Sequence, residues 1–246
     1  MSLTGNPGRV AGFLYLLLGF SVIRPFYVGS ALIVRGNAIA TVNNIAAHES
    51  LFRFGIATDL LTGVSCIVVA VALYRVFKPV NQDLAALMVI LGGLMPCAVG
   101  FFNVLNDVAT LFLARGGEFL SVMEKPQRAA LAMLFLRVHD HGFLINEIFA
   151  GLWLLPFGIL VFRSRSIPRF IGVWLVININ GLAYVLISFT GLLAPNYVDR
   201  VSRATFPALA GEGAIMLWLM IKGAKCQPAG DAGALPIAVK STSTAQ

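Results

Sequence analysis

The densest group of residues that could do chemistry lies just before a long apolar stretch. It contains two histidines, two carboxylates and one amide, at His139, Asp140, His141, Asn146 and Glu147. Ionisable groups at or inside apolar spans are costly in free energy, which makes them candidates for function. Histidine together with carboxylates suits zinc, iron or manganese, and it equally suits proton relay or the capture of a cation. We therefore treat this group as the first candidate site.

Five further polar groups interrupt other apolar stretches, at Arg24, Asp59, Asn103, Asp107 and Glu212. Asn103 and Asp107 are four residues apart, so they share one face of a helix. On the topology predicted below, these groups lie in the outer half of their spans. We expect them to line one water-accessible polar cavity with the group around His139. Nearer the middle of another span, at most one of Asn178 and Asn180 can face that cavity, because they are two residues apart.

Three of these groups also have a purely structural interpretation. Arg24 precedes Pro25, so it either ends a short first span and extends to the headgroups or pairs with a carboxylate such as Glu147 or Asp107. Asp59 near a helix start could simply stabilise the helix through a favourable interaction with its dipole. Glu212 would face the headgroups if the last span began later in the chain. The sequence leaves these alternatives open.

A divalent metal (zinc, iron or manganese) is the only cofactor that the pattern suggests, with His139, Asp140 and His141 as ligands. His139 and His141 point in nearly opposite directions on a regular helix, so they can share one metal only if the helix begins or breaks at Gly142. Such a metal could activate water against an ester or amide of a lipid. Neither an HExxH nor a GxSxG motif occurs, and the P-loop and dinucleotide fingerprints are absent as well.

The composition excludes an ordinary soluble domain. Hydrophobic residues make up 58% of the chain and charged residues only 12%, about half the usual charged fraction of a soluble domain. Six apolar stretches are each long enough to cross a bilayer, and they cover approximately residues 10–23, 54–74, 84–114, 142–162, 171–193 and 206–221. We predict an all-α membrane protein whose residues 1–226 form a bundle of six transmembrane helices. The tail 227–246 is rich in small and polar residues and is expected to be disordered.

Two features modify this simple bundle. Residues 119–136 have the pattern of an amphipathic helix that precedes span four. Apolar sequence also resumes after Arg24, over residues 26–34. In span three, Pro96 follows Gly92 and Gly93, which predicts a kink near the proline.

The net charge of +7 comes from arginines and lysines that flank the spans. They are dispersed, so a nucleic-acid partner is not expected. Short basic connections lie on the face that carries both termini, which the positive-inside rule assigns to the cytoplasm. We expect an integral membrane protein with cytoplasmic termini and the lipid bilayer as its main partner. The oligomeric state is open.

Several short motifs together resemble a known family. They cover residues 9–16 (RVAGFLYL), 49–55 (ESLFRFG), 139–143 (HDHGF), 167–169 (IPR) and 181–184 (GLAY). The chain resembles, over residues 8–223, the bacterial integral membrane family of unknown function DUF4386. This resemblance implies the six-span architecture and a location in the bacterial inner membrane, and it supplies no activity.

Three classes of function remain. The preferred one is a receptor, carrier or accessory protein that binds a small ligand, lipid or ion in a polar cavity in the outer half of the bundle. The second is a metal-dependent membrane hydrolase that acts on a lipid-like substrate. The third is a structural partner of another membrane protein, with Gly92, Gly93 and Gly151 as close-packing positions. Whether the protein is an enzyme stays open at this point.

Overall fold

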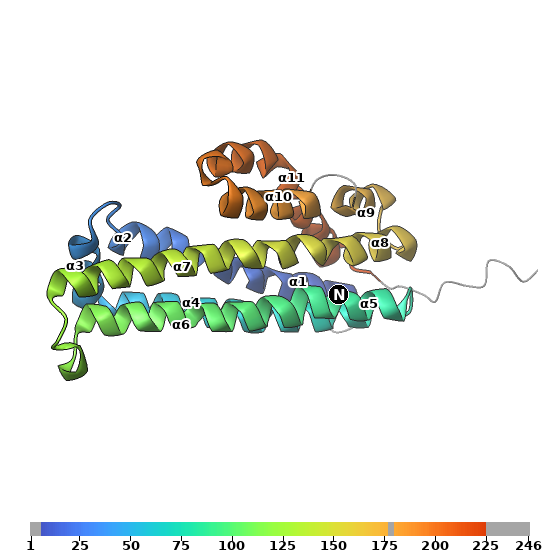
Figure 1. Ribbon diagram of the computed structural model, residues 1–246. Helices are drawn as coiled ribbons and strands as arrows, with labels where there is room; N and C mark the ends of the chain where they lie inside the picture. Colours follow the sequence, from blue (N-terminus) through green and yellow to red (C-terminus); the bar gives the residue numbers. More distant parts are fainter. Residues whose placement is uncertain (1–5, 177–179, 225–246) are drawn as a thin grey trace, which may run out of the picture.

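The computed structural model describes residues 6–176 and 180–224, and all regular elements within these ranges are helical (Figure 1). The predicted all-helical class is therefore confirmed. The predicted disordered tail 227–246 lies outside the described residues, as does Asn178.

Four described segments are long and apolar enough to cross a membrane. They are Pro7–Leu32, Glu49–Phe77, Gln82–Arg115 and Lys125–Ser164. In Figure 1 these segments lie side by side, with successive ones running in opposite directions. The predicted count of six is not confirmed, because the apolar stretches Gly181–Leu193 and Glu212–Ile221 of the last two helices are shorter than a membrane span.

The first span continues through Arg24 instead of ending there. It consists of α1 (Pro7–Tyr15), a 3₁₀ segment η2 (Leu16–Val22), a π-helical segment η3 (Arg24–Gly29) and α2 (Ser30–Leu32). Pro25 lies at the start of η3, where a proline is tolerated because the first helical N–H groups need no partner within the helix. Arg24 is thereby held inside a span of 26 residues.

The separate amphipathic helix predicted before span four does not exist. A capping box between Glu124 and Gln127 starts α7 (Lys125–Leu152), which then runs without interruption past His139 and Gly142. The short helix α8 (Leu154–Ser164) extends it. In the sequence, the polar run from Arg137 to His141 resembles a connection between two helices. In the structure, one regular helix distributes these side chains over different faces, so the prediction of a separate helix is wrong.

The third span contains the irregularity predicted near Pro96. It is a π-helical turn η4 (Ile90–Leu94) between α5 (Gln82–Val89) and α6 (Met95–Arg115). A Cβ added to Gly92 or Gly93 would meet Trp153 or Ala70, so these glycines let α7 and α4 approach the turn.

The remaining helices connect and cover the four spans. They are α3 (Ala38–Ala47), α4 (Glu49–Phe77), η5 (Glu118–Leu120), α9 (Arg169–Val176), α10 (Asn180–Leu193), η6 (Pro195–Tyr197) and α11 (Val198–Ile221). In Figure 1, α10 lies along α7, while α11 crosses behind it to reach α1.

The two ends of the described chain meet through α1 and α11. The side chain of Asn6 accepts hydrogen bonds from the N–H groups of Gly8 (3.0 Å) and Ala224 (3.3 Å). A Cβ on Gly8 would collide with the backbone of Ala224, and one on Gly12 would collide with that of Met220. Glycine is therefore what permits this close approach.

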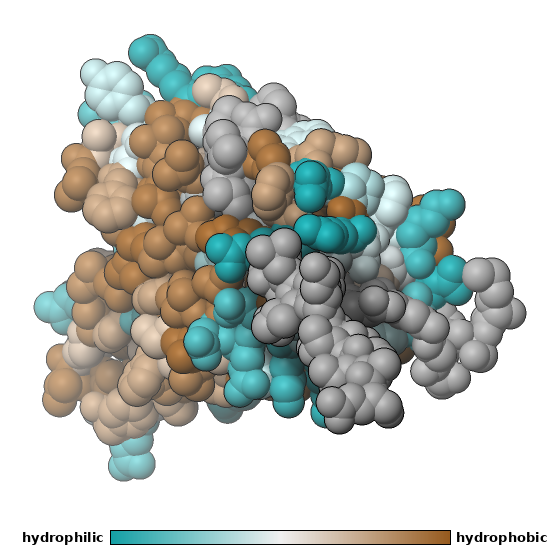
Figure 2. Space-filling model, turned by 90° about the vertical axis from the view of Figure 1, so that its right-hand side faces the viewer, coloured by the Kyte–Doolittle hydropathy of each residue, from teal (hydrophilic) through white to brown (hydrophobic). Residues whose placement is uncertain are grey.

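The outer surface of the bundle is unusually apolar. Large side chains such as Phe26, Phe102 and Leu193 are 71%, 76% and 78% exposed. Figure 2, which looks onto the end of the bundle that carries α5, α8 and α9, shows hydrophobic side chains covering one flank and hydrophilic ones gathered on the end itself. This distribution is typical of helices whose sides face lipid and whose ends face water.

Candidate functional site

Four charged or titratable side chains from four different segments meet inside the bundle. Arg24 comes from η3, Asp59 from α4, Asp107 from α6 and His139 from α7. Arg24 Nη2 lies 2.6 Å from Asp107 Oδ1, and Arg24 Nε lies 3.1 Å from Asp59 Oδ2. We call these four residues the ion cluster. Of the two alternatives for Arg24, the structure therefore supports pairing with a carboxylate.

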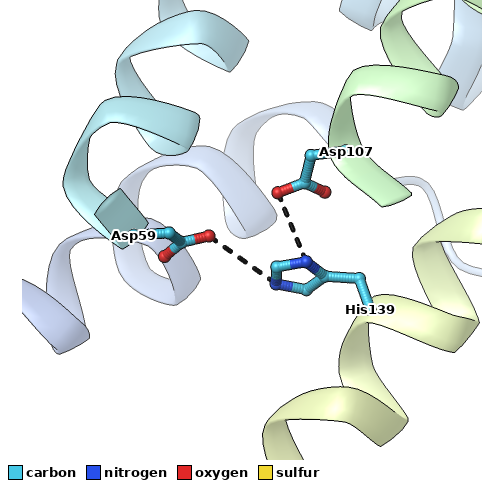
Figure 3. A group of neighbouring side chains, drawn as sticks. All are labelled: Asp59, Asp107 and His139. Atoms are coloured by element: carbon cyan, nitrogen blue, oxygen red, sulfur yellow. Dashed lines mark ion pairs between the residues drawn. The ribbon is translucent and has the colours of Figure 1, made fainter. Parts of the chain in front are cut away.

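His139 lies between the two carboxylates of the ion cluster (Figure 3). Its Nδ1 is 3.3 Å from Asp107 Oδ2, and its Nε2 is 3.7 Å from Asp59 Oδ2. Asp107 is fully buried and His139 is 5% exposed. Among the described residues, Asp107 Oδ2 and His139 Nδ1 are buried atoms without a hydrogen-bond partner. The cluster thus holds two carboxylates and one guanidinium, and a further positive charge would balance an ionised pair of aspartates.

The ion cluster also has the composition of a metal site. One ligand atom each from Asp59, Asp107 and His139 lies within 4.8 Å of the others. Two carboxylate oxygens and one imidazole form a donor set suited to zinc, iron or manganese. Arg24 contacts Asp107 through the other carboxylate oxygen, Oδ1, and leaves Oδ2 free for a ligand role. These three residues fit a divalent ion.

The metal ligands suggested by the sequence are arranged differently. The helix does not break at Gly142, so His139 and His141 stay on different faces of α7. Asp140 and His141 are exposed, and His141 Nδ1 lies 2.7 Å from the carbonyl oxygen of Arg137. The structure therefore brings His139 to Asp59 and Asp107 instead of to its sequence neighbours.

Gly142 has a packing role between α6 and α7. A Cβ at this position would collide with the side chain of Asn103, whose Nδ2 donates to the carbonyl oxygen of His139 at 2.9 Å. Asn106 Nδ2 in turn donates to the Asn103 carbonyl oxygen at 3.1 Å. These contacts hold α6 and α7 together beside the ion cluster.

Glu212 lies in a second polar group, away from the ion cluster. Its Oε1 accepts a hydrogen bond from the Tyr15 hydroxyl at 2.6 Å, and its Oε2 accepts one from the Tyr184 hydroxyl at 2.7 Å. Glu212 thus connects α1, α10 and α11 and faces the interior of the protein. The alternative that it faces the lipid headgroups is excluded.

Beside Glu212 lies a cavity of about 400 Å³, which we call the carboxylate cavity. Glu147 and Asn146 line it, and Glu147 Oε2 and Asn146 Oδ1 are buried without a hydrogen-bond partner among the described residues. Other residues of the wall come from α1, η2, α4, η4, α6, α7, α10 and α11, and include Tyr15, Gly19, Cys66, Gly92, Trp153, Tyr184 and Gly213.

A smaller hollow of about 60 Å³ connects the two polar regions. Asp59, Asn103 and His139 line it, and it shares Cys66 and Asn146 with the carboxylate cavity. The predicted site residues therefore form two neighbouring groups instead of one cavity. Asp140 lines neither the carboxylate cavity nor the smaller hollow, and His141 lines a separate open hollow between α6 and α7. The side chain of Asn180 is outside the described part of the chain, as Asn178 is.

Three aromatic residues of the cavity are not among the site residues predicted from the sequence. Tyr15 and Tyr184 are the partners of Glu212, and Trp153 stacks on Tyr15 with ring centroids 5.9 Å apart. Tyr15 and Tyr184 do occur in motifs that carry the family resemblance. A buried tyrosine usually needs a hydrogen-bond partner for its hydroxyl, which is the signal that could have linked them to a carboxylate.

Comparison with known proteins gives one match. The family model described as "Domain of unknown function (DUF4386)" matches residues 10–223. No curated protein and no solved structure matches the chain. The family description names no activity, so the function has to be argued from the geometry above. Because the match spans most of its length and both polar groups, the chain belongs to the DUF4386 family.

Proposed function

We propose that this protein binds a small ligand in the carboxylate cavity between the long spans and the α10–α11 pair. The observation that carries the proposal is Glu147 Oε2, a buried carboxylate oxygen beside about 400 Å³ of space and without a protein partner among the described residues. Buried polar atoms in folded proteins nearly always have a partner, and this one has room for a ligand instead. The volume lies within the usual range of small-molecule sites.

A gain in cavity filling tests this proposal. Gly213 lines the cavity and a Cβ there would meet no atom within 4 Å, so the side chain of Gly213→Leu starts in open space and should fill part of the cavity. A Cβ at Gly29 would meet only the carbonyl oxygen of Arg24, at 3.8 Å, an ordinary van der Waals contact, and Gly29 does not line the cavity, which makes Gly29→Leu the matched control. Native mass spectrometry of protein extracted gently from its membrane should show a small-molecule adduct in the wild type and in Gly29→Leu. The adduct should be lost in Gly213→Leu. A wild type without an adduct, or an adduct that Gly213→Leu retains, contradicts the proposal.

We also propose six membrane spans with cytoplasmic termini, with α9–α10 as the fifth span and α11 as the sixth. Supporting this count, α11 has 24 residues, a length of about 36 Å that suffices to cross a bilayer. Three arginines lie at helix ends on the side of the bundle where α1 begins: Arg75 in the last turn of α4, Arg163 in the last turn of α8 and Arg169 at the start of α9. They favour that end as the cytoplasmic one. A reporter fused after Gln246 should be active only in its cytoplasm-sensing form. Activity in the opposite form would contradict this orientation.

A metal-dependent hydrolase is the second candidate, and the ion cluster favours it. Asp59, Asp107 and His139 offer a suitable donor set, and a bound divalent metal would supply an activated water for an ester or amide bond of a lipid-like substrate. Elemental analysis of protein purified without chelators should then find about one zinc, iron or manganese per chain. His139→Ala should lose the metal and His141→Ala should keep it. No metal in the wild type, or equal loss in both variants, contradicts this candidate.

The structural-partner alternative has no specific observation in its favour. Added Cβ atoms at Gly92, Gly93 and Gly151 would meet Trp153, Ala70 and the Gly181 carbonyl oxygen, all within this chain. These glycines are therefore used in packing the bundle itself, which leaves them unavailable to a second protein.

A further inference from the structure

We propose that the ligand of the carboxylate cavity carries a positively charged ammonium group on a small apolar body. This inference rests on the proposed function and specifies its ligand class. Three properties of the cavity wall lead to it: the sign of its charges, its aromatic rings and its unpaired hydrogen-bond acceptors.

The wall contains carboxylates but no compensating cation. Glu147 and Glu212 both line the cavity, and none of its described lining residues is a lysine, arginine or histidine. The buried Arg24 forms ion pairs with Asp59 and Asp107 in the ion cluster instead. In a low-dielectric interior a cationic ligand would gain from these carboxylates, and an anionic one would be repelled.

The two glutamates differ in how the protein satisfies them. Both oxygens of Glu212 accept hydrogen bonds from tyrosine hydroxyls. Glu147 Oε2 has no such partner among the described residues, and neither has the neighbouring acceptor Asn146 Oδ1. The unpaired polar atoms of the cavity wall are therefore hydrogen-bond acceptors. They require a ligand that donates N–H groups or carries a positive charge.

Aromatic rings surround the same space. Tyr15, Phe143, Trp153 and Tyr184 line the cavity. Trp153 stacks on both Tyr15 and the core residue Phe157, with ring centroids 5.9 Å and 5.2 Å apart, whereas Phe143 and Tyr184 have no ring-stacking partner among the described residues. The faces of such rings attract ammonium groups, most strongly where water is excluded. They also provide apolar surface for the body of the ligand. A free organic amine and the ammonium headgroup of a lipid share this chemistry.

Cys66 offers a direct test, because it is a free, half-buried cysteine that lines the cavity. The experiment uses the full chain with Cys97→Ala and Cys226→Ala, so that Cys66 is the sole thiol. Its rates of reaction with a trimethylammonium-ethyl and a sulfonatoethyl methanethiosulfonate are compared, each normalised to the rate with free 2-mercaptoethanol. We expect the cationic reagent to be favoured by about tenfold. Choline should protect Cys66, and its uncharged isostere 3,3-dimethylbutan-1-ol should not.

Glu147→Gln should remove most of the cationic preference, whereas Glu118→Gln, at an exposed residue outside the cavity, should leave it unchanged. No preference in the wild type, or equal protection by choline and its isostere, overturns the ammonium proposal. If Gly213→Leu then still blocks the uncharged methyl methanethiosulfonate, the ligand cavity itself stands and only the ligand class falls. If Gly213→Leu changes no rate at all, the cavity proposal falls as well.

The two sources of an ammonium group are separated by the bilayer. The uncharged methyl reagent is compared in nanodiscs of phosphatidylcholine and of phosphatidylglycerol, because its local concentration does not depend on lipid charge. Protection of Cys66 by phosphatidylcholine alone identifies a lipid headgroup as the ligand. Equal rates in both lipids, with protection only by added choline, identify a soluble amine.

Discussion

The ion cluster and the carboxylate cavity use the same kind of residue in opposite ways. In the ion cluster, Asp59 and Asp107 are paired with Arg24 and approached by His139, and the adjoining hollow measures only about 60 Å³. In the carboxylate cavity, Glu147 and Glu212 have no protein cation among the lining residues and face about 400 Å³ of space. The ion cluster contains a counter-charge of its own in Arg24, whereas the described wall of the carboxylate cavity contains none.

This difference separates stability from binding. Charges that are paired inside the protein are expensive to break, because the remaining partner stays buried and uncompensated. A buried carboxylate without a hydrogen-bond partner reduces the stability of the protein when the cavity is empty. A bound ligand that donates to the carboxylate would offset this cost. Substitutions in the ion cluster should therefore lower the free energy of unfolding strongly. Substitution of the unpaired carboxylate in the cavity should instead affect binding and leave the free energy of unfolding nearly unchanged.

The largest effect is expected for Arg24→Met, which leaves two aspartates facing each other without their guanidinium. We expect a loss of about 3–5 kcal/mol in the free energy of unfolding, as for other broken buried ion pairs. Unfolding in mixed detergent micelles with increasing sodium dodecyl sulfate measures it. The control is Arg53→Met, because Arg53 makes an exposed pair with Glu49 at 2.6 Å, and such surface pairs contribute at most about 1 kcal/mol. Similar losses in both variants would remove the distinction between the ion cluster and the surface.

An intermediate effect is expected for Tyr184→Phe, which removes one of the two hydroxyls that donate to Glu212. The loss should be about 1–3 kcal/mol, the cost of leaving a buried acceptor unsatisfied. A double-mutant cycle with Glu212→Gln should give a clear coupling energy between the two residues. Tyr197→Phe, at an exposed tyrosine, should have no measurable effect. Additive losses in the cycle would mean that the hydrogen bond does not stabilise the α10–α11 contact.

The smallest effect on stability is expected for Glu147→Gln. Because Glu147 Oε2 has no partner to lose, the free energy of unfolding should change by no more than about 0.5 kcal/mol or should even rise. The same variant should have the strongest effect on cation access to Cys66. A loss as large as that of Tyr184→Phe would show that Glu147 is a structural residue and would break the comparison of the two regions.

The sequence predicts the class of this fold well and the side-chain partners poorly. Apolar stretches of span length identify helices almost regardless of context, because a backbone in lipid must satisfy its own hydrogen bonds. The start of α7 at Lys125 and its passage through Gly142 were missed, since consecutive polar residues such as Asp140 and His141 hide which face of a helix is buried. A local pattern carries no information on which distant helix packs against that face.

The same reason explains the outcome for the candidate residues. From the sequence, Arg24 could either extend to the lipid headgroups or pair with a carboxylate such as Asp107. The packing of the bundle brings Arg24 and Asp107 together and so distinguishes between the two. His139 was selected for its neighbours in sequence, yet its partners Asp59 and Asp107 come from α4 and α6. Tyr15 and Glu212 are 197 residues apart. Pairs of this kind depend on the packing of helices that one sequence alone does not specify.

The junction of α1 with α11 has a consequence for how the protein is made. Tyr15 leaves the ribosome among the first residues, but its carboxylate partner Glu212 comes 197 residues later. Ala224, against whose backbone Gly8 packs, comes 216 residues after Gly8. During synthesis the first span must therefore wait in the membrane with its inner face uncovered while the others insert. The wall of the carboxylate cavity is completed last, because α11 contributes Glu212, Gly213 and Met216 to it.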